Sequence, residues 1–319
     1  MLKILLTLSL LFTFSLQATE FLPSWNEGKS KTNIVNYVNS VTDKNSSDFI
    51  PLEDRIAVFD NDGTLWSEQP VYFQFLFVAD RVKALAPQHP EWKNTQPFKA
   101  VLEGDIESII TSGKKGIMEL LMATHTGMSD EEFDAIVLNW IKTAKHPTKK
   151  VHYSQLVFHP MLELLDYMRA NGFKTFIVSG GGIDFMRPWA SKVYGIPSSQ
   201  IIGSELEVKY VDKKIVRIPK VRFLNDKDEK PVAIHYHIGK RPVAAFGNSD
   251  GDFAMMEYTE ANKQYKTLQL YVHHTDAKRE WTYDRKSHIG KLDKGLDYAN
   301  KHNWTVVNMK KDWKVIYPQ

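Results

Sequence analysis

Short apolar runs followed by polar turns recur along most of the chain. Residues 56–59 form a run that ends abruptly in the polar segment 60–64, and similar runs cover residues 174–178, 243–246 and 268–272. Apolar runs of this length, bounded by turn residues, are typical of strands buried on both faces of a parallel sheet. We therefore expect a set of parallel strands at the centre of the molecule.

Helical segments separate these runs. Residues 162–171, 183–193 and 231–238 indicate helices, whereas residues 206–208 and 215–217 indicate the two strands of a hairpin. Alternating strands and helices predict an α/β fold, with a Rossmann-like parallel sheet core that is covered by helices on both faces.

Residues 66–150 have helical texture throughout. Ser129 followed by Glu132 is a capping box, which predicts a helix from there to about Thr143. We therefore predict an all-helical cap inserted after the first core strand. The predicted division places the cap in residues 66–150 and the core in residues 19–65 and 151–319.

The first residues have the layout of a secretory signal peptide. Lys3 precedes an apolar run over residues 4–16, and the small residue Ala18 follows it. A membrane anchor is the alternative, but the run is shorter than the roughly 20 apolar residues that span a bilayer. We expect residues 1–18 to be removed, which leaves an exported protein, periplasmic or secreted, without a stable membrane anchor.

Composition narrows the chemistry. The 319 residues are 43% hydrophobic, which excludes a disordered chain, and they contain no cysteine, which excludes disulfides, thiolate metal sites and cysteine nucleophiles. The formal net charge is +3, and basic pairs are scattered along the chain. This balance gives no support for nucleic-acid binding, which usually needs a concentrated basic surface.

Three of the predicted strands end in polar, glycine-containing turns, at residues 60–64, 179–182 and 247–252. Ligands of open parallel sheets bind beyond the carboxyl ends of the strands, so these turns should share one edge. They would bring together the four carboxylates Asp60, Asp62, Asp250 and Asp252. Clustered carboxylates repel one another unless a cation neutralises them, and an all-oxygen ligand set favours Mg²⁺.

A divalent cation beside carboxylates suits phosphoryl transfer. The cation offsets charge repulsion, so that a carboxylate can attack phosphorus, while a second one can protonate the leaving alcohol and then activate water. Ser179 and the backbone N–H of Gly180, before the next helix, are suited to hold phosphoryl oxygens. Lys230 would fix the nucleophile and offset its charge.

These motifs resemble those of the haloacid dehalogenase superfamily. The segment 60–64 after its strand is similar to the first motif, Ser179 to the second, Lys230 to the third and the turn 247–252 to the fourth, in the family's order. The resemblance covers about two-thirds of the chain and is nearest to the phosphoserine-phosphatase-like branch with a helical cap. It implies the following roles: Asp60 as nucleophile; Asp62 as general acid and base; Thr64, Ser179, Gly180 and Lys230 as phosphate ligands; Asp60, Asp62, Asn248, Asp250 and Asp252 as the Mg²⁺ site.

The resemblance thus predicts a Mg²⁺-dependent phosphatase that hydrolyses a small phosphomonoester through an aspartyl-phosphate intermediate. Two departures from the family's pattern bear on this. Asn248 stands where the family usually has an aspartate, so either Asn248 or Asp250 would bind the metal directly. Gln69, with Glu68 before it, stands where phosphoserine phosphatases carry a substrate-binding glutamate. Trp66, Glu68 and Gln69 directly follow the nucleophile turn and could line the substrate pocket.

Other interpretations stay open on sequence alone. Lys240 is a rival for the lysine of the third motif. Residues 247–251 also fit the nucleophile elbow of a serine hydrolase, with Ser249 as nucleophile and a triad completed by Asp276 or Asp284 and His288 or His302. That interpretation leaves the segment 60–64 unexplained. A non-catalytic binding protein on the same scaffold is the third alternative.

Overall fold

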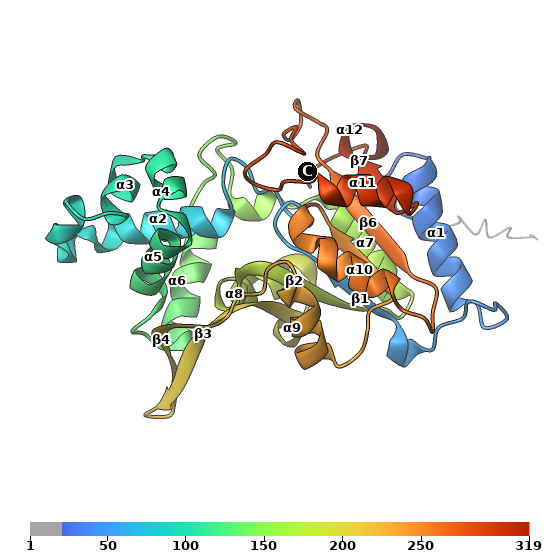
Figure 1. The fold of residues 1–319 in the computed structure, drawn as a ribbon, viewed down its shortest axis with the longest axis horizontal. Helices are drawn as coiled ribbons and strands as arrows, with labels where there is room; N and C mark the ends of the chain where they lie inside the picture. The colour runs from blue at the N-terminus through green and yellow to red at the C-terminus, as the bar shows by residue number, and fades with distance from the viewer. Residues whose placement is uncertain (1–20, 319) are drawn as a thin grey trace, which may run out of the picture.

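The computed structural model describes residues 21–318, so the predicted signal peptide lies outside the described residues. Seven strands form one sheet in the order β4-β3-β2-β1-β5-β6-β7 (Figure 1). All neighbours are parallel except β3 and β4, which are antiparallel. The strands are β1 (Ile56–Phe59), β2 (Lys174–Gly182), β3 (Ile201–Val211), β4 (Lys214–Phe223), β5 (Ala244–Gly247), β6 (Leu268–His273) and β7 (Thr305–Asn308).

Helices cover both faces of this sheet. All four residues of β1 are buried, and they face the two sides alternately. Ala57 and Phe59 belong to the core under α1 (Lys29–Thr42), α7 (His159–Ala170) and α8 (Ile183–Tyr194). Ile56 and Val58 belong to the core under α9 (Glu229–Ile238), α10 (Phe253–Glu260) and α11 (Lys294–Lys301). The predicted α/β sheet with helices on both faces is confirmed.

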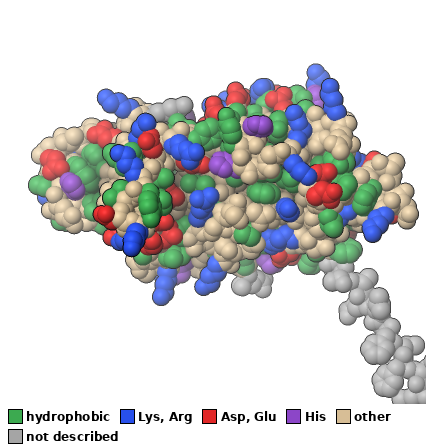
Figure 2. All heavy atoms as spheres, turned by 90° about the horizontal axis from the view of Figure 1, so that it is seen from below, with side chains coloured by type: hydrophobic (Ala, Val, Ile, Leu, Met, Phe, Trp, Pro, Cys, Tyr) green, Lys and Arg blue, Asp and Glu red, His purple; other side chains and the backbone are tan. Residues whose placement is uncertain are grey.

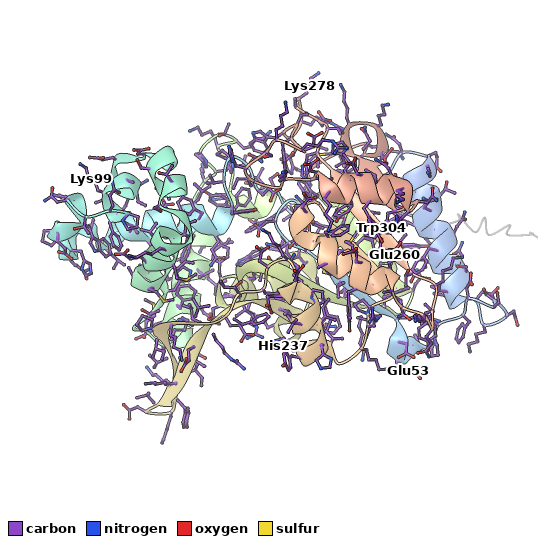
Figure 3. All side chains as sticks on the ribbon, in the orientation of Figure 1. Glu53, Lys99, His237, Glu260, Lys278 and Trp304 are labelled. Atoms are coloured by element: carbon purple, nitrogen blue, oxygen red, sulfur yellow. The ribbon has the colours of Figure 1, made fainter. Side chains whose placement is uncertain are left out.

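Short helical turns complete the core. On its outer side Trp304 donates its indole N–H to Glu260, 2.8 Å away, which ties the end of α10 to the segment after α11 (Figure 3). The remaining short elements are η1 (Leu52–Asp54), η4 (Tyr153–Gln155), η5 (Ser198–Gln200), η6 (Asp250–Asp252) and α12 (Met309–Asp312). No helix among residues 21–318 is both long and apolar enough to cross a membrane.

An all-helical insertion follows the first strand, as predicted. Its elements are α2 (Phe73–Leu85), η2 (Ala86–Gln88), η3 (Pro90–Lys93), α3 (Phe98–Glu103), α4 (Ile106–Thr111), α5 (Gly113–His125) and α6 (Asp130–Thr143). The predicted capping box is present: Ser129 Oγ accepts from Glu132 N at 3.3 Å, and Glu132 Oε2 accepts from Ser129 N at 2.8 Å. The insertion has a small core of its own around Val82, Trp92 and Leu120, and it extends away from the sheet toward Lys99 (Figures 1 and 3).

The hairpin formed by β3 and β4 is longer than predicted and contacts the insertion. Arg217 of β4 is buried and donates to the carbonyls of His125 and Ser129 at 2.9 and 2.8 Å. Its guanidinium lies 4.3 Å from the ring centre of Phe133. The hairpin is therefore part of the junction between the sheet and the insertion.

The structure corrects one prediction about β2. Residues 179–182 were expected to form a turn, but the strand continues to Gly182, which pairs with Ser204 after an irregularity in the register. The glycines give no apolar signal, so the sequence pattern misses an extension that depends on pairing with β3.

Candidate active site

The site lies at the carboxyl ends of β1, β2 and β5, which are adjacent at the centre of the sheet. Strands β2 and β3 lie on one side of β1 in the sheet, and strands β5, β6 and β7 lie on the other side. Such a switch point leaves a crevice between the diverging connections, where α/β proteins bind ligands. Asp60 and Asn248 directly follow β1 and β5, and Ser179 lies in the last part of β2.

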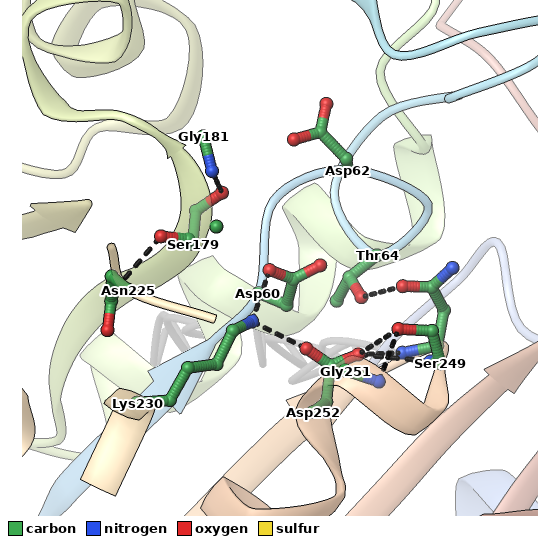
Figure 4. A network of polar contacts seen from close by, with 12 residues as sticks. Asp60, Asp62, Thr64, Ser179, Gly181, Asn225, Lys230, Ser249, Gly251 and Asp252 are labelled. Atoms are coloured by element: carbon green, nitrogen blue, oxygen red, sulfur yellow. Dashed lines mark hydrogen bonds and ion pairs between the residues drawn. The ribbon is translucent and has the colours of Figure 1, made fainter. Parts of the chain in front are cut away.

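Lys230 joins two buried carboxylates. Its ammonium lies 2.7 Å from Asp60 Oδ1 and 2.6 Å from Asp252 Oδ1, and all three side chains are almost fully buried (Figure 4). Burial opposes the charge on Lys230, but Asp252 and Asp60 outweigh it and raise its pKa. Burial and the neighbouring charge of Asp252 raise the pKa of Asp60 to about 8, against the opposing effect of Lys230. Lys230 thus fixes the orientation of Asp60, and no described residue donates a hydrogen bond to the other oxygen of Asp60, Oδ2.

Lys240 takes no part in this arrangement. Its ammonium contacts Asp54 and the carbonyl of Glu53 at the surface. Of the two candidate lysines, Lys230 is the one that the fold places beside Asp60.

The turn after β1 also carries Asp62. Its Oδ1 accepts the indole N–H of Trp66 at 2.8 Å, and the Asn61 side chain also interacts with this carboxylate. Burial raises the pKa of Asp62 to about 6, and the hydrogen bond from Trp66 acts in the opposite direction. Trp66 is fully buried and stacks on Trp189 at 4.4 Å. It therefore holds Asp62 from behind and does not form an exposed pocket wall.

Gly63 allows this turn to close on the neighbouring loop. Its φ is +73°, a region that favours glycine, and a Cβ there would collide with the side chains of Asn248 and Glu68. The Gly63 carbonyl lies 2.8 Å from Nε2 of the buried His274, and His274 Nδ1 lies 3.0 Å from Glu280. His274 thus supports the back of the turn. Neither histidine of the 273–274 pair had a predicted role.

Asn248 lies in a buried polar cluster with Thr64 and Glu68. Its Oδ1 accepts from the Thr64 hydroxyl at 3.2 Å, and its Nδ2 donates to Glu68 Oε1 at 2.7 Å. Tyr283 also donates to Glu68 Oε1, at 2.8 Å. Burial raises the pKa of Glu68 well above its usual value, although the bond from Tyr283 lowers it. Thr64 was predicted to bind phosphate and Glu68 to line the substrate pocket, and in the structure both hold the amide of Asn248.

Ser179 and Thr64 lie on opposite sides of Asp60 (Figure 4). Ser179 Oγ accepts from Gly181 N at 3.0 Å, and the Ser179 carbonyl accepts from Asn225 Nδ2 at 2.9 Å. The hydroxyl proton of Ser179 remains available for a ligand, and Gly180 beside it is exposed. Asn225 was missed by the sequence analysis, because an asparagine in a turn carries no distinguishing pattern. Gln69, the last predicted pocket residue, donates to the Ile289 carbonyl at 3.3 Å.

Two carboxylates predicted to bind metal are engaged elsewhere. Asp250 accepts from the backbone N–H groups of Asp293, Lys294 and Gly295 at 2.8–3.3 Å, at the start of α11, so the structure does not bring it to Asp60. Asp252 uses Oδ1 for Lys230 and Oδ2 for the backbone N–H groups of Asn248 and Ser249. Asp252 therefore shapes the turn, and Asn248 is the residue of this turn whose side-chain oxygen faces Thr64.

No group of three or more His, Asp and Glu side chains among residues 21–318 is arranged to hold a metal ion. The oxygens that remain for a cation are Asp60 Oδ2, the Asp62 carbonyl, which accepts no hydrogen bond from any described residue, and Asn248 Oδ1. Such a set suits Mg²⁺, which binds through one or two carboxylates and keeps several waters or substrate oxygens.

The serine-hydrolase arrangement is not assembled. Ser249 Oγ accepts from Gly251 N and donates to Asp252, and no histidine in the described part of the chain contacts it. Among the proposed partners, His302 contacts Glu260, and Asp276 contacts Arg279. The geometry therefore favours the first motif over the elbow.

Comparisons with known proteins agree with this geometry. Residues 57–257 match the family described as haloacid dehalogenase-like hydrolase. A conserved protein of unknown function from Anaerococcus prevotii DSM 20548 shares the fold, with a TM-score of 0.56 and 16% identity over 90% of this chain and 94% of that one. A phosphoserine phosphohydrolase-like protein from Francisella tularensis subsp. tularensis SCHU S4 aligns at a TM-score of 0.38, with 18% identity over 68% of this chain and 87% of that one. No curated protein sequence matches. The chain belongs to the family of haloacid dehalogenase-like hydrolases.

Proposed function

We propose that the protein is a Mg²⁺-dependent phosphatase that hydrolyses a small phosphomonoester through an aspartyl-phosphate on Asp60. The observation that carries the proposal is the placement of two buried carboxylates on one turn, with Asp60 Oδ2 accepting no hydrogen bond from any described residue. Asp60 Oδ2 is available for attack, because Lys230 holds Oδ1, and Asp62, whose Oδ1 is held by Trp66, supplies the carboxyl for proton transfer.

The reaction divides into two steps that balance in atoms and charge. Asp60 Oδ2 attacks phosphorus, the bond to the leaving oxygen breaks, and the protonated carboxyl of Asp62 gives its proton to that oxygen. The carboxylate of Asp62 then takes a proton from a water that attacks the phosphorus of the aspartyl-phosphate. Inorganic phosphate leaves, and Asp60 returns to its starting form.

Ser179, Gly180 and Lys230 supply the contacts to the phosphoryl oxygens in this proposal. The Ser179 hydroxyl and the Gly180 N–H would donate to these oxygens, and Lys230, whose ammonium lies 2.7 Å from Asp60 Oδ1, adds a positive charge. Mg²⁺, held by Asp60, the Asp62 carbonyl and Asn248, would offset the charge repulsion between the phosphoryl group and the carboxylate.

The surroundings are proposed to fit the same activity. The helical insertion would act as a cap that limits water at the site. On the face drawn in Figure 2, basic and acidic side chains are intermixed, which suits a small-molecule substrate better than nucleic acid. Export is proposed from Lys3 and the apolar run 4–16 alone.

The direct test is hydrolysis of p-nitrophenyl phosphate by the purified protein, with and without EDTA. We expect turnover that EDTA abolishes and added Mg²⁺ restores. Asp60→Asn should remove turnover and leave the circular dichroism spectrum unchanged. Turnover that survives EDTA, or that a fluorophosphonate abolishes, would show that the proposed chemistry is wrong.

A further inference from the structure

A cavity of about 110 Å³ lies next to the proposed phosphoryl site. Its walls come from the insertion, the end of β2, the start of α8 and the hairpin. Most of the lining is apolar, with Met118 and Leu121 from α5, Leu206 from β3 and Val221 from β4. At this volume the cavity has room for several water-sized groups.

The cavity is close to the proposed acid. It is lined by Gly180 and Gly182, on either side of Gly181. A Cβ on Gly181 would lie 3.6 Å from Asp62 Oδ2 and 3.4 Å from Oε1 of Gln74, which also lines the cavity. A group that receives a proton from Asp62 therefore lies beside this cavity.

Neutral hydrogen bonds fix the polar wall of the cavity. Gln74 Oε1 accepts from Gly182 N at 2.7 Å, and Gln74 Nε2 lies 3.3 Å from His125 Nε2. The Thr124 hydroxyl donates to the Leu120 carbonyl, so it accepts from His125 Nδ1, and His125 Nε2 accepts from Gln74. Burial lowers the pKa of His125 to about 3, so the ring is neutral.

The charged groups of the cavity are negative. Asp184 and Glu205 line it. Glu205 pairs with Arg222 at 3.0 Å on its outer side, and Asp184 lies 3.8 Å from the buried guanidinium of Arg217. None of the described residues that line the cavity is a lysine or an arginine. An anionic group placed here would lose its hydration and face two lining carboxylates, while the nearest guanidinium groups are already paired with those carboxylates, which is unfavourable.

We propose that this cavity binds the leaving group of the substrate, and that the substrate class is a monoester of a small, mainly apolar alcohol without a negative charge. The inference rests on the proposed phosphatase function. Phosphate esters whose alcohol carries a carboxylate or a second phosphate are then poor substrates.

The test compares two phosphate esters of equal length, n-butyl phosphate and 4-(phosphonooxy)butanoate, which differ by a terminal methyl or carboxylate. We expect kcat/KM for the butyl ester to exceed that for the carboxylate ester at least tenfold. Equal values, or a preference for the carboxylate ester, would overturn the inference while leaving the phosphatase function standing. Hydrolysis of neither ester nor of p-nitrophenyl phosphate would instead refute the proposed function itself.

Variants locate the preference in the cavity. Leu121→Lys places a cation there and should raise the ratio of kcat/KM for the carboxylate ester over the butyl ester at least tenfold. Leu138→Lys, at an exposed position of α6 in the same insertion, is the matched control and should leave the ratio unchanged. Glu205→Gln removes a lining carboxylate with little change in shape and should move the ratio in the same direction as Leu121→Lys. If neither cavity variant moves the ratio, the cavity is not the leaving-group site.

Discussion

Single hydrogen bonds orient the side chains of the proposed active site and affect their protonation, and Trp66 is the clearest case. Its indole N–H stabilises the charged form of Asp62, while burial favours the protonated form and raises the pKa to about 6. Asp62 donates its proton only when protonated. Asp60 attacks only when ionised, and its pKa is raised to about 8, so the first step should slow by about tenfold per pH unit above about 8.

Trp66→Phe removes the N–H and should raise the pKa of Asp62 further. The kcat/KM values on the falling limb then increase, because more Asp62 is protonated there, which a pH series with p-nitrophenyl phosphate measures. Trp189→Phe is the control, because the Trp189 N–H has no partner among the described residues. Superimposable profiles for Trp66→Phe and the wild type would contradict this role of Trp66.

Asn248 and Glu68 form a second such pair. Glu68 accepts from Asn248 Nδ2, which directs Oδ1 toward Thr64 and the proposed cation position. Asn248→Asp alone places two buried carboxylates against each other and should lower the melting temperature in EDTA. In the double variant with Glu68→Gln, the new amide at position 68 donates to the carboxylate at position 248, so the hydrogen bond is restored in the reverse direction. The double variant should therefore recover the melting temperature. It should also recover the affinity for Mg²⁺, measured by calorimetric titration. A double variant no better than Asn248→Asp would show that the hydrogen bond does not position the amide.

The residues near β1 could be predicted because a short motif carries them. Asp60 and Asp62 directly follow a buried strand. Lys230 was one of two candidate lysines, and the fold places it beside Asp60. Asp250 could not be placed in the same way, since its carboxylate turns toward N–H groups at residues 293–295, far along the chain. His274 and Tyr283 reach the site from distant segments without any local pattern.

At the scale of elements, the hairpin connects the sheet to the helical insertion through Arg217. This guanidinium satisfies two carbonyls of the insertion in a buried setting. The sequence predicts the hairpin from its alternating pattern and the insertion from its helical texture. Their contact could not be predicted, because Arg217 looks like any polar position of an exposed strand.

Arg217→Met should lower the free energy of unfolding by about 2–3 kcal/mol, since both carbonyls then stay buried without a donor. Urea denaturation followed by circular dichroism measures this loss. Arg222→Met, at an exposed position of the same strand, should cost less than about 1 kcal/mol. A similar loss of unfolding free energy in the two variants would show that the buried contacts of Arg217 contribute no more to stability than an exposed ion pair.

At the scale of the whole molecule, the reversal of strand order at β1 brings together the carboxyl-terminal parts of three strands that are distant in sequence. The near-neutral net charge of +3 means that the positive potential for a phosphoryl group has to be local. Lys230 and the N–H groups beside Ser179 supply part of it, and the proposed Mg²⁺ supplies the rest. The α/β architecture was predictable from alternating elements, whereas the cavity beside the site depends on packing between the insertion and the hairpin.

The most direct test of this account is to stop turnover of p-nitrophenyl phosphate with acid and to locate the phosphoryl group by peptide mass spectrometry. The account predicts one phosphoryl group on Asp60 in the wild-type protein and none in Asp60→Asn. Asp62→Asn should slow the release of phosphate and increase the phosphorylated fraction. A phosphoryl group on another residue, such as Ser249, or steady turnover by Asp60→Asn, would contradict the central claim that Asp60 is the nucleophile.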